Sequence, residues 1–390
     1  MLYQEVDGGL GGPPRPFSRV GRIAAVLAMT IARVALADDA PQGSPPGTAP
    51  GSSDLSLAAY LDTAYSHLSG DGRFTSGTAD RVFDTKSDSA TLQQAAVSFG
   101  YQPKAGVGAF VNVIAGDDAS VIRPYNYSGS SAHFDVTQAY LQWASAAVTV
   151  IAGRFVTLAG AEAITSTANT NFSRSILFGF AIPFTHTGAR ATVTAGDTVC
   201  LYLGINNGWD DVDDTTSSRT VELGAGYTPS RAVNVTVSGY FGNQRVGGLV
   251  GAGPEGQRAL LDVVATWNVT ETVSVVANMD AGRQSNVMPT TGGMRTDARW
   301  DGVALYFNWM ISDRWRSSLR AEYFDDAAGY RTGVPQVWRE LTATVAYLSG
   351  KHLEFRGERR VDVSSASSFQ ASDGTADGQG SVAFEVLYKY

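Results

Sequence analysis

The chain has 390 residues, of which 44% are hydrophobic and 17% are charged, and its formal net charge is −8. A net negative charge argues against nucleic acid as a partner, because nucleic-acid-binding proteins present a basic surface. The single cysteine, Cys200, excludes an intramolecular disulfide framework and a cysteine-rich metal site. The 43 glycines and the thin spread of hydrophobic residues argue against an ordinary soluble enzyme.

Residues 1–37 have the order of an export signal. Arg15, Arg19 and Arg22 precede an apolar run from residue 23 to residue 32, and Ala35-Leu36-Ala37 has the pattern of a cleavage site. We therefore expect a signal peptide over residues 1–37. Arg33 interrupts the end of the apolar part, so a short buried helix and a start codon further downstream remain alternatives.

Residues 38–55 are rich in proline, glycine and serine and cannot bury a core, so they predict a disordered periplasmic linker. No stretch of about 20 apolar residues follows, so a membrane-spanning helix is not expected. The remaining membrane-spanning architecture is a closed β-barrel, in which the strands pair all backbone groups with one another.

From residue 56 onward, hydrophobic and polar residues alternate at every second position. In one such segment Val233, Val235 and Val237 alternate with polar residues. Strands of about 9–11 residues with lipid-facing side chains at every second position are typical of transmembrane barrels. We place sixteen strands, with 14 or 18 as alternatives, near residues 56–66, 91–102, 105–115, 134–145, 147–156, 184–196, 198–206, 218–228, 231–242, 257–268, 272–283, 299–310, 314–325, 338–348, 351–362 and 380–390.

The connections between these strands alternate between tight turns and longer polar loops. Gln102-Pro103-Lys104 and Ser349-Gly350 are examples of the turns, and residues 67–90 and 116–133 are examples of the loops. In bacterial barrels the short turns face the periplasm and the long loops face outside. Residues 56–390 therefore predict an all-β fold, a transmembrane antiparallel up-and-down β-barrel in the bacterial outer membrane.

Aromatic residues recur beside the tight turns on the face that the alternation assigns to lipid, as in the girdles of membrane barrels. The last strand ends in Tyr390 and resembles the C-terminal signature of outer-membrane barrels. That resemblance implies that the barrel-assembly machinery recognises Tyr390. The predicted periplasmic girdle consists of Tyr101, Trp143, Tyr227, Trp267, Trp309, Trp315 and Tyr347.

The connection of residues 157–183 is long, and its second half, residues 176–182, is too apolar to extend freely into water. We expect this third loop to fold into the lumen, where Glu162 would face a basic wall. An external loop that packs on its neighbours is the alternative, and whether the loop narrows or closes the lumen stays open. The candidate residues of the pore lining and constriction are Glu162, Arg174, His186, Arg190, Arg258, Asp262, Arg316, Arg320, Glu322, Glu354 and Arg356.

Several short motifs between residues 138 and 188 resemble the β-barrel porins of the OmpL-like type. The resemblance implies an outer-membrane porin and transfers no catalytic residues. The motifs are Gln138-Ala139-Tyr140-Leu141-Gln142-Trp143, Ala152-Gly153-Arg154-Phe155, Gly160-Ala161-Glu162, Asn171-Phe172-Ser173-Arg174-Ser175 and Pro183-Phe184-Thr185-His186-Thr187-Gly188.

Other motifs carry weaker hypotheses. Residues 251–256 match G-x-G-x-x-G, but no helical pattern follows, which argues against a nucleotide site. Asp210, Asp211, Asp213 and Asp214 have the chemistry of a divalent-cation site, and we interpret them as an acidic exposed loop. No cofactor or metal is expected.

The expected function is passive diffusion of small hydrophilic solutes or ions through a water-filled lumen, without a catalytic step. A structural or adhesive barrel with a blocked lumen is the first alternative. An outer-membrane hydrolase built on some of the four histidines is the second. The expected partners are outer-membrane lipid, lipopolysaccharide, the barrel-assembly machinery and the solutes; a homotrimer stays open.

Overall fold

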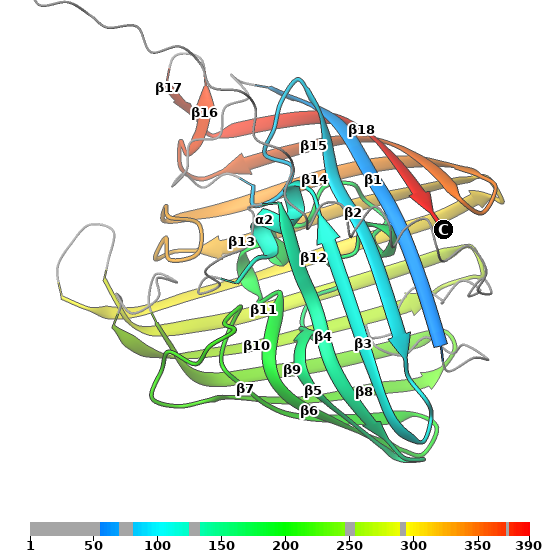
Figure 1. The fold of residues 1–390 in the computed structure, drawn as a ribbon. Coiled ribbons are helices and arrows are strands. Elements are labelled where there is room, and N and C mark those ends of the chain that lie inside the picture. Colours follow the sequence, from blue (N-terminus) through cyan, green and yellow to red (C-terminus); the bar gives the residue numbers. More distant parts are fainter. Residues whose placement is uncertain (1–54, 70–80, 125–132, 246–253, 289–293, 372–373) are drawn as a thin grey trace, which may run out of the picture. The chain divides into compact units, whose positions relative to one another are not determined.

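Sixteen antiparallel strands close into one barrel, each paired with its neighbour along the chain (Figure 1). The computed structural model describes residues 55–69, 81–124, 133–245, 254–288, 294–371 and 374–390. No helix within these residues is long and apolar enough to cross a membrane. The predicted sixteen-stranded up-and-down barrel is confirmed.

The strands are β1 (Leu55–Ser69), β2 (Ser89–Tyr101), β3 (Gly106–Ala115), β4 (Phe134–Ala144), β5 (Val148–Val156), β6 (Thr185–Ala195), β7 (Val199–Asn206), β8 (Thr220–Ser230), β9 (Val233–Arg245), β10 (Glu255–Asn268), β11 (Val273–Val287), β12 (Thr296–Ser312), β13 (Trp315–Asp326), β14 (Gln336–Ser349), β15 (Leu353–Ser364) and β18 (Gly378–Lys389). On the long-loop side, β1, β2, β9 to β15 and β18 are longer than the alternation predicted, because these hairpins continue to pair where both faces are polar, whereas β3 to β8 end at or just short of the predicted positions.

Two small elements in the connections were not expected from the sequence. A short helix, α2 (Asp117–Ile122), lies in the second long loop, and β16 (Phe369–Ala371) pairs with β17 (Gly374–Ala376) in the last one. Both lack the long alternation from which we predicted strands. The predicted signal peptide, and residues 38–54 of the predicted linker, lie outside the described residues. Leu55, which was predicted as the last linker residue, is the first residue of β1.

Closure of the barrel joins the first and last strands (Figure 1, blue and red). The register pairs Tyr60 with Lys389 and Ser69 with Gly380, and the backbone N–H of Tyr390 donates to the carbonyl of Ala59 at 2.9 Å. The closed ladder leaves no strand edge unpaired, as a spanning structure in lipid requires.

The alternation separates an apolar outer face from a polar inner face. On β15, for example, Val361 and Val363 are exposed on the outside, while Arg360 and Asp362 are buried on the inside. The seven residues of the predicted girdle all lie on the outer face, and their exposed fractions include 45% for Tyr101 and 55% for Trp267. Their position beside the tight turns fits one membrane interface.

The interior of the barrel contains its own hydrophobic cluster. Leu177 and Phe178 of the connection between β5 and β6 pack there with wall residues such as Trp300, Phe324 and Trp338. Phe83, from the connection between β1 and β2, joins them. Apolar loop segments thus fill part of the lumen, and they position the polar residues described next.

Candidate pore constriction

Residues 157–183, called the lumen loop below, connect β5 to β6 and contain the 3₁₀ turn η1 (Ser166–Ala168) and the π-helical turn η2 (Leu177–Ala181). At its start, the N–H of Gly160 donates to Asp262 at 3.0 Å and that of Ala161 to Asn278 at 3.1 Å. Gly160 has φ +94°, and a Cβ there would lie 2.5 Å from Ile182. Glycine is therefore required where the loop turns onto the wall.

Two wall carboxylates hold consecutive backbone N–H groups of the lumen loop. Glu358 on β15 accepts from Phe172 at 2.8 Å and Ser173 at 3.0 Å. Glu322 on β13 accepts from Ile176 at 3.0 Å and Leu177 at 3.2 Å. Hydrogen bonds to a charged acceptor are the stronger kind, and they satisfy N–H groups that no regular element would pair.

Wall arginines complement these carboxylates by donating to loop carbonyls. Arg320 donates to Ser173 at 2.6 Å, Arg356 to Asn169 at 2.9 Å, and Arg360 to the carbonyl of residue 174 at 2.7 Å. The wall therefore binds the main chain of the loop through both its donors and its acceptors. A loop with no regular structure can lie inside the barrel because its polar backbone groups are paired there.

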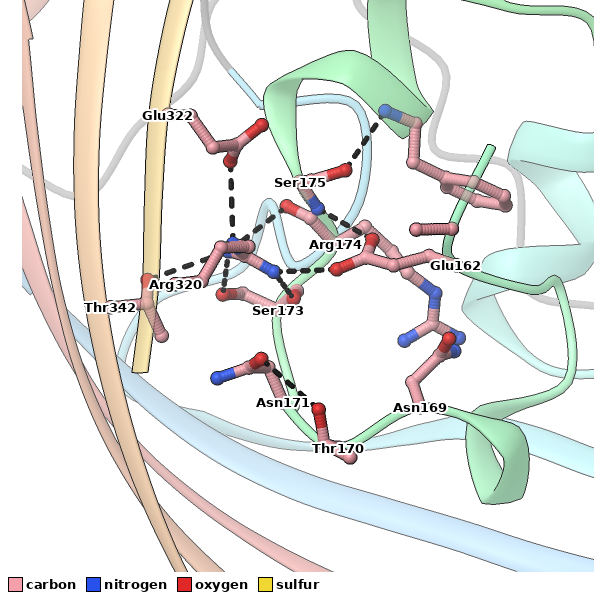
Figure 2. A network of polar contacts seen from close by, with 12 residues as sticks. Glu162, Asn169, Thr170, Asn171, Ser173, Arg174, Ser175, Arg320, Glu322 and Thr342 are labelled. Atoms are coloured by element: carbon pink, nitrogen blue, oxygen red, sulfur yellow. Dashed lines mark hydrogen bonds and ion pairs between the residues drawn. The ribbon is translucent and has the colours of Figure 1, made fainter. Parts of the chain in front are cut away.

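Arg320 is the centre of this network, and Figure 2 shows its contacts with Ser173, Glu162 and Glu322. Its guanidinium lies 2.8 Å from Glu162 on the loop, and 3.1 Å from Glu340 and 3.3 Å from Glu322 on the wall. The side chain of Arg320 is 0% exposed. The sequence predicted that Glu162 and the basic wall face each other, and in the structure they form a direct ion pair.

Arg316, Glu354 and Arg356 form a second group on the tight-turn side of the network. Glu354 pairs with both arginines, and Arg356 also contacts Glu385 of β18 at 3.0 Å. Polar alternation in the sequence already places Glu358 and Arg360 in the lumen, although neither was among the constriction candidates, because every inward position of β15 from 354 to 362 is charged, with alternating sign. Glu385 was not predicted.

Arg174 lies on the lumen loop itself and acts within it. It donates to the carbonyls of Phe172 and Ile164 at 3.1 and 3.0 Å, and it lies 4.0 Å from Asp118 of α2. Arg174 therefore braces the fold of the loop and joins it to the second long loop.

The other candidates lie around the rim of this network. Arg190 on β6 pairs with Glu222 on β8 and lies over the ring of Phe155 at 4.4 Å. Arg258 on β10 donates to Gln284 at 2.7 Å and to Tyr330 at 2.6 Å. His186 on β6 is 0% exposed and stacks on Tyr240. None of these three contacts Glu162 or Arg320 among the contacts described for these residues.

The acidic segment after β7 differs from its interpretation as an exposed loop, which was wrong for two of its residues. Asp210 accepts from the N–H groups of Phe184 and Thr185 at 2.9 and 2.8 Å, and Asp211 accepts from Gln244 at 2.6 Å. Both are buried because this segment folds back onto the end of the lumen loop. Within the described residues, no group of three or more metal-ligating side chains is suitably arranged.

Burial divides the lumen into two halves. Toward the tight turns, inward residues such as Asn234, Thr236 and Thr266 are partly exposed. One step further along the same two strands, Ser238 and Asp262 are 0% exposed, at the level where the lumen loop crosses. A region of partly exposed inward side chains on the tight-turn side thus meets a hydrogen-bonded layer. This layer consists of the lumen loop and its wall partners, and its inward side chains are buried.

Asp118 of α2 gives the packed loops a pH dependence. It accepts from Gln94 at 2.6 Å, and burial raises its pKa from an ordinary value of 3.8 to about 7. The folded state therefore holds a proton that the unfolded chain releases, so stability is expected to fall as the pH rises from about 4 to about 7. Asp118→Asn should flatten the dependence of the urea midpoint on pH in this window. An unchanged slope would show that this carboxyl does not titrate there.

Comparison with known proteins decides the family. The family model described as "Putative beta-barrel porin-2, OmpL-like" matches residues 54–390. The chain belongs to this family. As an OmpL-like porin it is an outer-membrane channel for passive diffusion. Its family and fold are those of a channel.

Solved structures share the fold of this OmpL-like porin at low identity. The channel DcaP of Acinetobacter baumannii has a TM-score of 0.56 at 13% identity, covering 86% of this chain and 97% of its own. An anion-selective porin from Comamonas acidovorans reaches 0.61 at 11% identity, with coverages of 86% and 99%. OprB of Pseudomonas putida reaches 0.58 at 12%, with 86% and 94%. No curated protein sequence matches significantly.

Proposed function

We propose that the lumen loop and its charged wall partners form the constriction of this porin. Only ions and small hydrophilic solutes pass this layer. The observation that carries the proposal is the main-chain binding of the loop by Glu322, Glu358 and Arg320, next to a tight-turn side where the inward side chains are partly exposed. Both signs of charge in the layer favour polar solutes over apolar ones.

The burial of the side chains in this layer favours a second candidate function, a barrel whose lumen is sealed by the lumen loop. Arg320 and Arg356 are 0% exposed, and apolar loop residues such as Leu177 fill the space beside them. In this case flux would require the loop to leave the wall. Both candidate functions place the constriction at the lumen loop and its wall partners. They differ in whether the unmodified protein conducts.

A liposome-swelling assay tests the proposed function. Liposomes that contain the purified porin should swell in solutions of small sugars and amino acids, and the rate should fall steeply as the solute becomes larger. Folded protein that gives no swelling with any solute would contradict an open pore and support the sealed barrel. Lipase and protease assays on the same preparation would expose a hydrolase.

The N-terminal segment and the assembly state complete the proposal. Residues 1–37 act as a cleaved signal peptide, and residues 38–54 act as a periplasmic linker, so the mature protein should begin at Asp38 in its intact mass. Assembly as a homotrimer is supported by the likeness to OmpT of Vibrio cholerae in a trimer form, with a TM-score of 0.57.

A further inference from the structure

The outer face of strands β11 to β14 changes abruptly from apolar to charged on the long-loop side. Apart from Ser317 and Ser349, the outward residues of these strands are apolar from the tight turns up to Ala281, Val303, Tyr323 and Leu341. The strands are neighbours in the barrel wall (Figure 1). The outward residues that follow are Arg283 on β11, Asp301 and Arg299 on β12, Asp325 on β13 and Arg339 on β14.

The position of these charges along the strands matches the second boundary of a membrane. Arg299 lies ten positions before the girdle residue Trp309, and Arg283 lies ten positions after Val273. At about 3.3 Å per residue and a tilt of roughly 40°, ten residues span ~25 Å, the height of the apolar band of an outer-membrane barrel. The guanidinium groups therefore lie at the level of the lipid headgroups of the outer leaflet.

Arg283 and Arg299 are direct cross-strand partners on this outer face. Both side chains are exposed, and within the described residues neither forms an ion pair. Like charges directly opposite each other destabilise a sheet. A negative charge placed between the two guanidinium groups would relieve this repulsion.

The chemistry of the pair selects a phosphate. A guanidinium donates two parallel hydrogen bonds to phosphate oxygens, and two of them on one face can hold one phosphate from both sides. The apolar residues Met279 and Leu305 lie next to this site toward the membrane centre. A lipid with a phosphate in its headgroup could contact the two arginines through the phosphate and the neighbouring apolar residues through its hydrocarbon chains.

We propose that Arg283 and Arg299 bind a phosphate of the anionic glycolipid of the outer leaflet, the lipid A portion of lipopolysaccharide. Arg339 on the same outer face, which lies 6.0 Å from the ring of Tyr323, adds positive charge. Asp301 and Asp325 are cross-strand partners on the same outer face, next to the arginine pair, and their negative charge opposes binding of the phosphate. Replacing one of these aspartates with a neutral residue should therefore strengthen lipid binding.

The test measures the unfolding temperature of the full porin in detergent with EDTA, titrated with lipid A carrying its phosphates or with the same lipid after enzymatic removal of phosphate. Phosphorylated lipid A should raise the unfolding temperature, and the dephosphorylated lipid should not. The variant with Arg283→Gln and Arg299→Gln should bind at least about tenfold more weakly. Asp301→Asn should bind at least as tightly as the unmodified protein.

A matched control uses two exposed arginines at the tight turns, Arg231→Gln together with Arg314→Gln, which should leave lipid binding unchanged. The proposal would be overturned if the control variant lost lipid A binding to the same extent, or if the dephosphorylated lipid raised the unfolding temperature as much as phosphorylated lipid A. Stabilisation by inorganic phosphate alone to the same extent would also overturn it, because the site would then take a soluble anion. The test does not measure conductance, so its result does not depend on whether the lumen loop forms the constriction.

Discussion

Replacement of residues 161–180 by a short Gly-Ser linker is expected to raise the single-channel conductance several-fold. The barrel wall remains complete, because none of its sixteen strands includes these residues. The deletion removes the apolar residues that fill the lumen and the backbone groups that Glu322 and Glu358 hold. A large open barrel without an inserted loop leaves an aqueous channel.

The matched control for the deletion shortens a different connection on the long-loop side. Removal of residues 289–293 between β11 and β12 keeps every described contact of the lumen loop. This variant should conduct like the unmodified protein. An equal increase in both variants would mean that a general loosening of the barrel, and not the lumen loop, sets the conductance.

Arg320→Met is expected to destabilise the porin strongly. The guanidinium is 0% exposed and is the shared partner of Glu162, Glu322 and Glu340. Removal of one partner of a buried ion pair typically costs about 3–5 kcal/mol, because the remaining charges stay buried without compensation. The lumen loop also loses the donor to Ser173, so conductance should rise in the fraction that folds.

The measurement is urea unfolding followed by the heat-modifiable gel mobility of the barrel. Arg314→Gln, at an exposed turn before the same strand, should change the free energy of unfolding by less than about 0.5 kcal/mol. The loss of free energy of unfolding for Arg320→Lys should lie between those of Arg320→Met and Arg314→Gln, since a lysine keeps the charge without the planar group of donors. A loss below about 1 kcal/mol for Arg320→Met would contradict the central role of this residue.

The barrel could be predicted from the sequence because its physical cause is local. The bilayer requires a period of two in every strand, and tight turns and aromatic residues mark where each hairpin ends. Strand ends on the long-loop side were predicted less well, as in β12, which starts at Thr296 and not near residue 299. There the hairpin has left the membrane, and both of its faces carry polar residues.

The constriction could be predicted only in outline. The apolar second half of the lumen loop predicted its location, and polar parity predicted the inward side chains of Arg320 and Glu322. The contacts themselves depend on the irregular path of the loop, which decides that Glu322 meets Ile176 and that Glu358 meets Phe172. No periodic pattern encodes these contacts, and the burial of every partner follows from them.

Conductance in planar lipid bilayers, with the unmodified porin and the variant lacking residues 161–180 measured side by side, tests the central claim most directly. The account predicts small discrete steps for the unmodified protein and steps several-fold larger for the variant. Equal steps from both proteins would show that the lumen loop is not the constriction. Silence of both well-folded proteins would show that the barrel is not a pore.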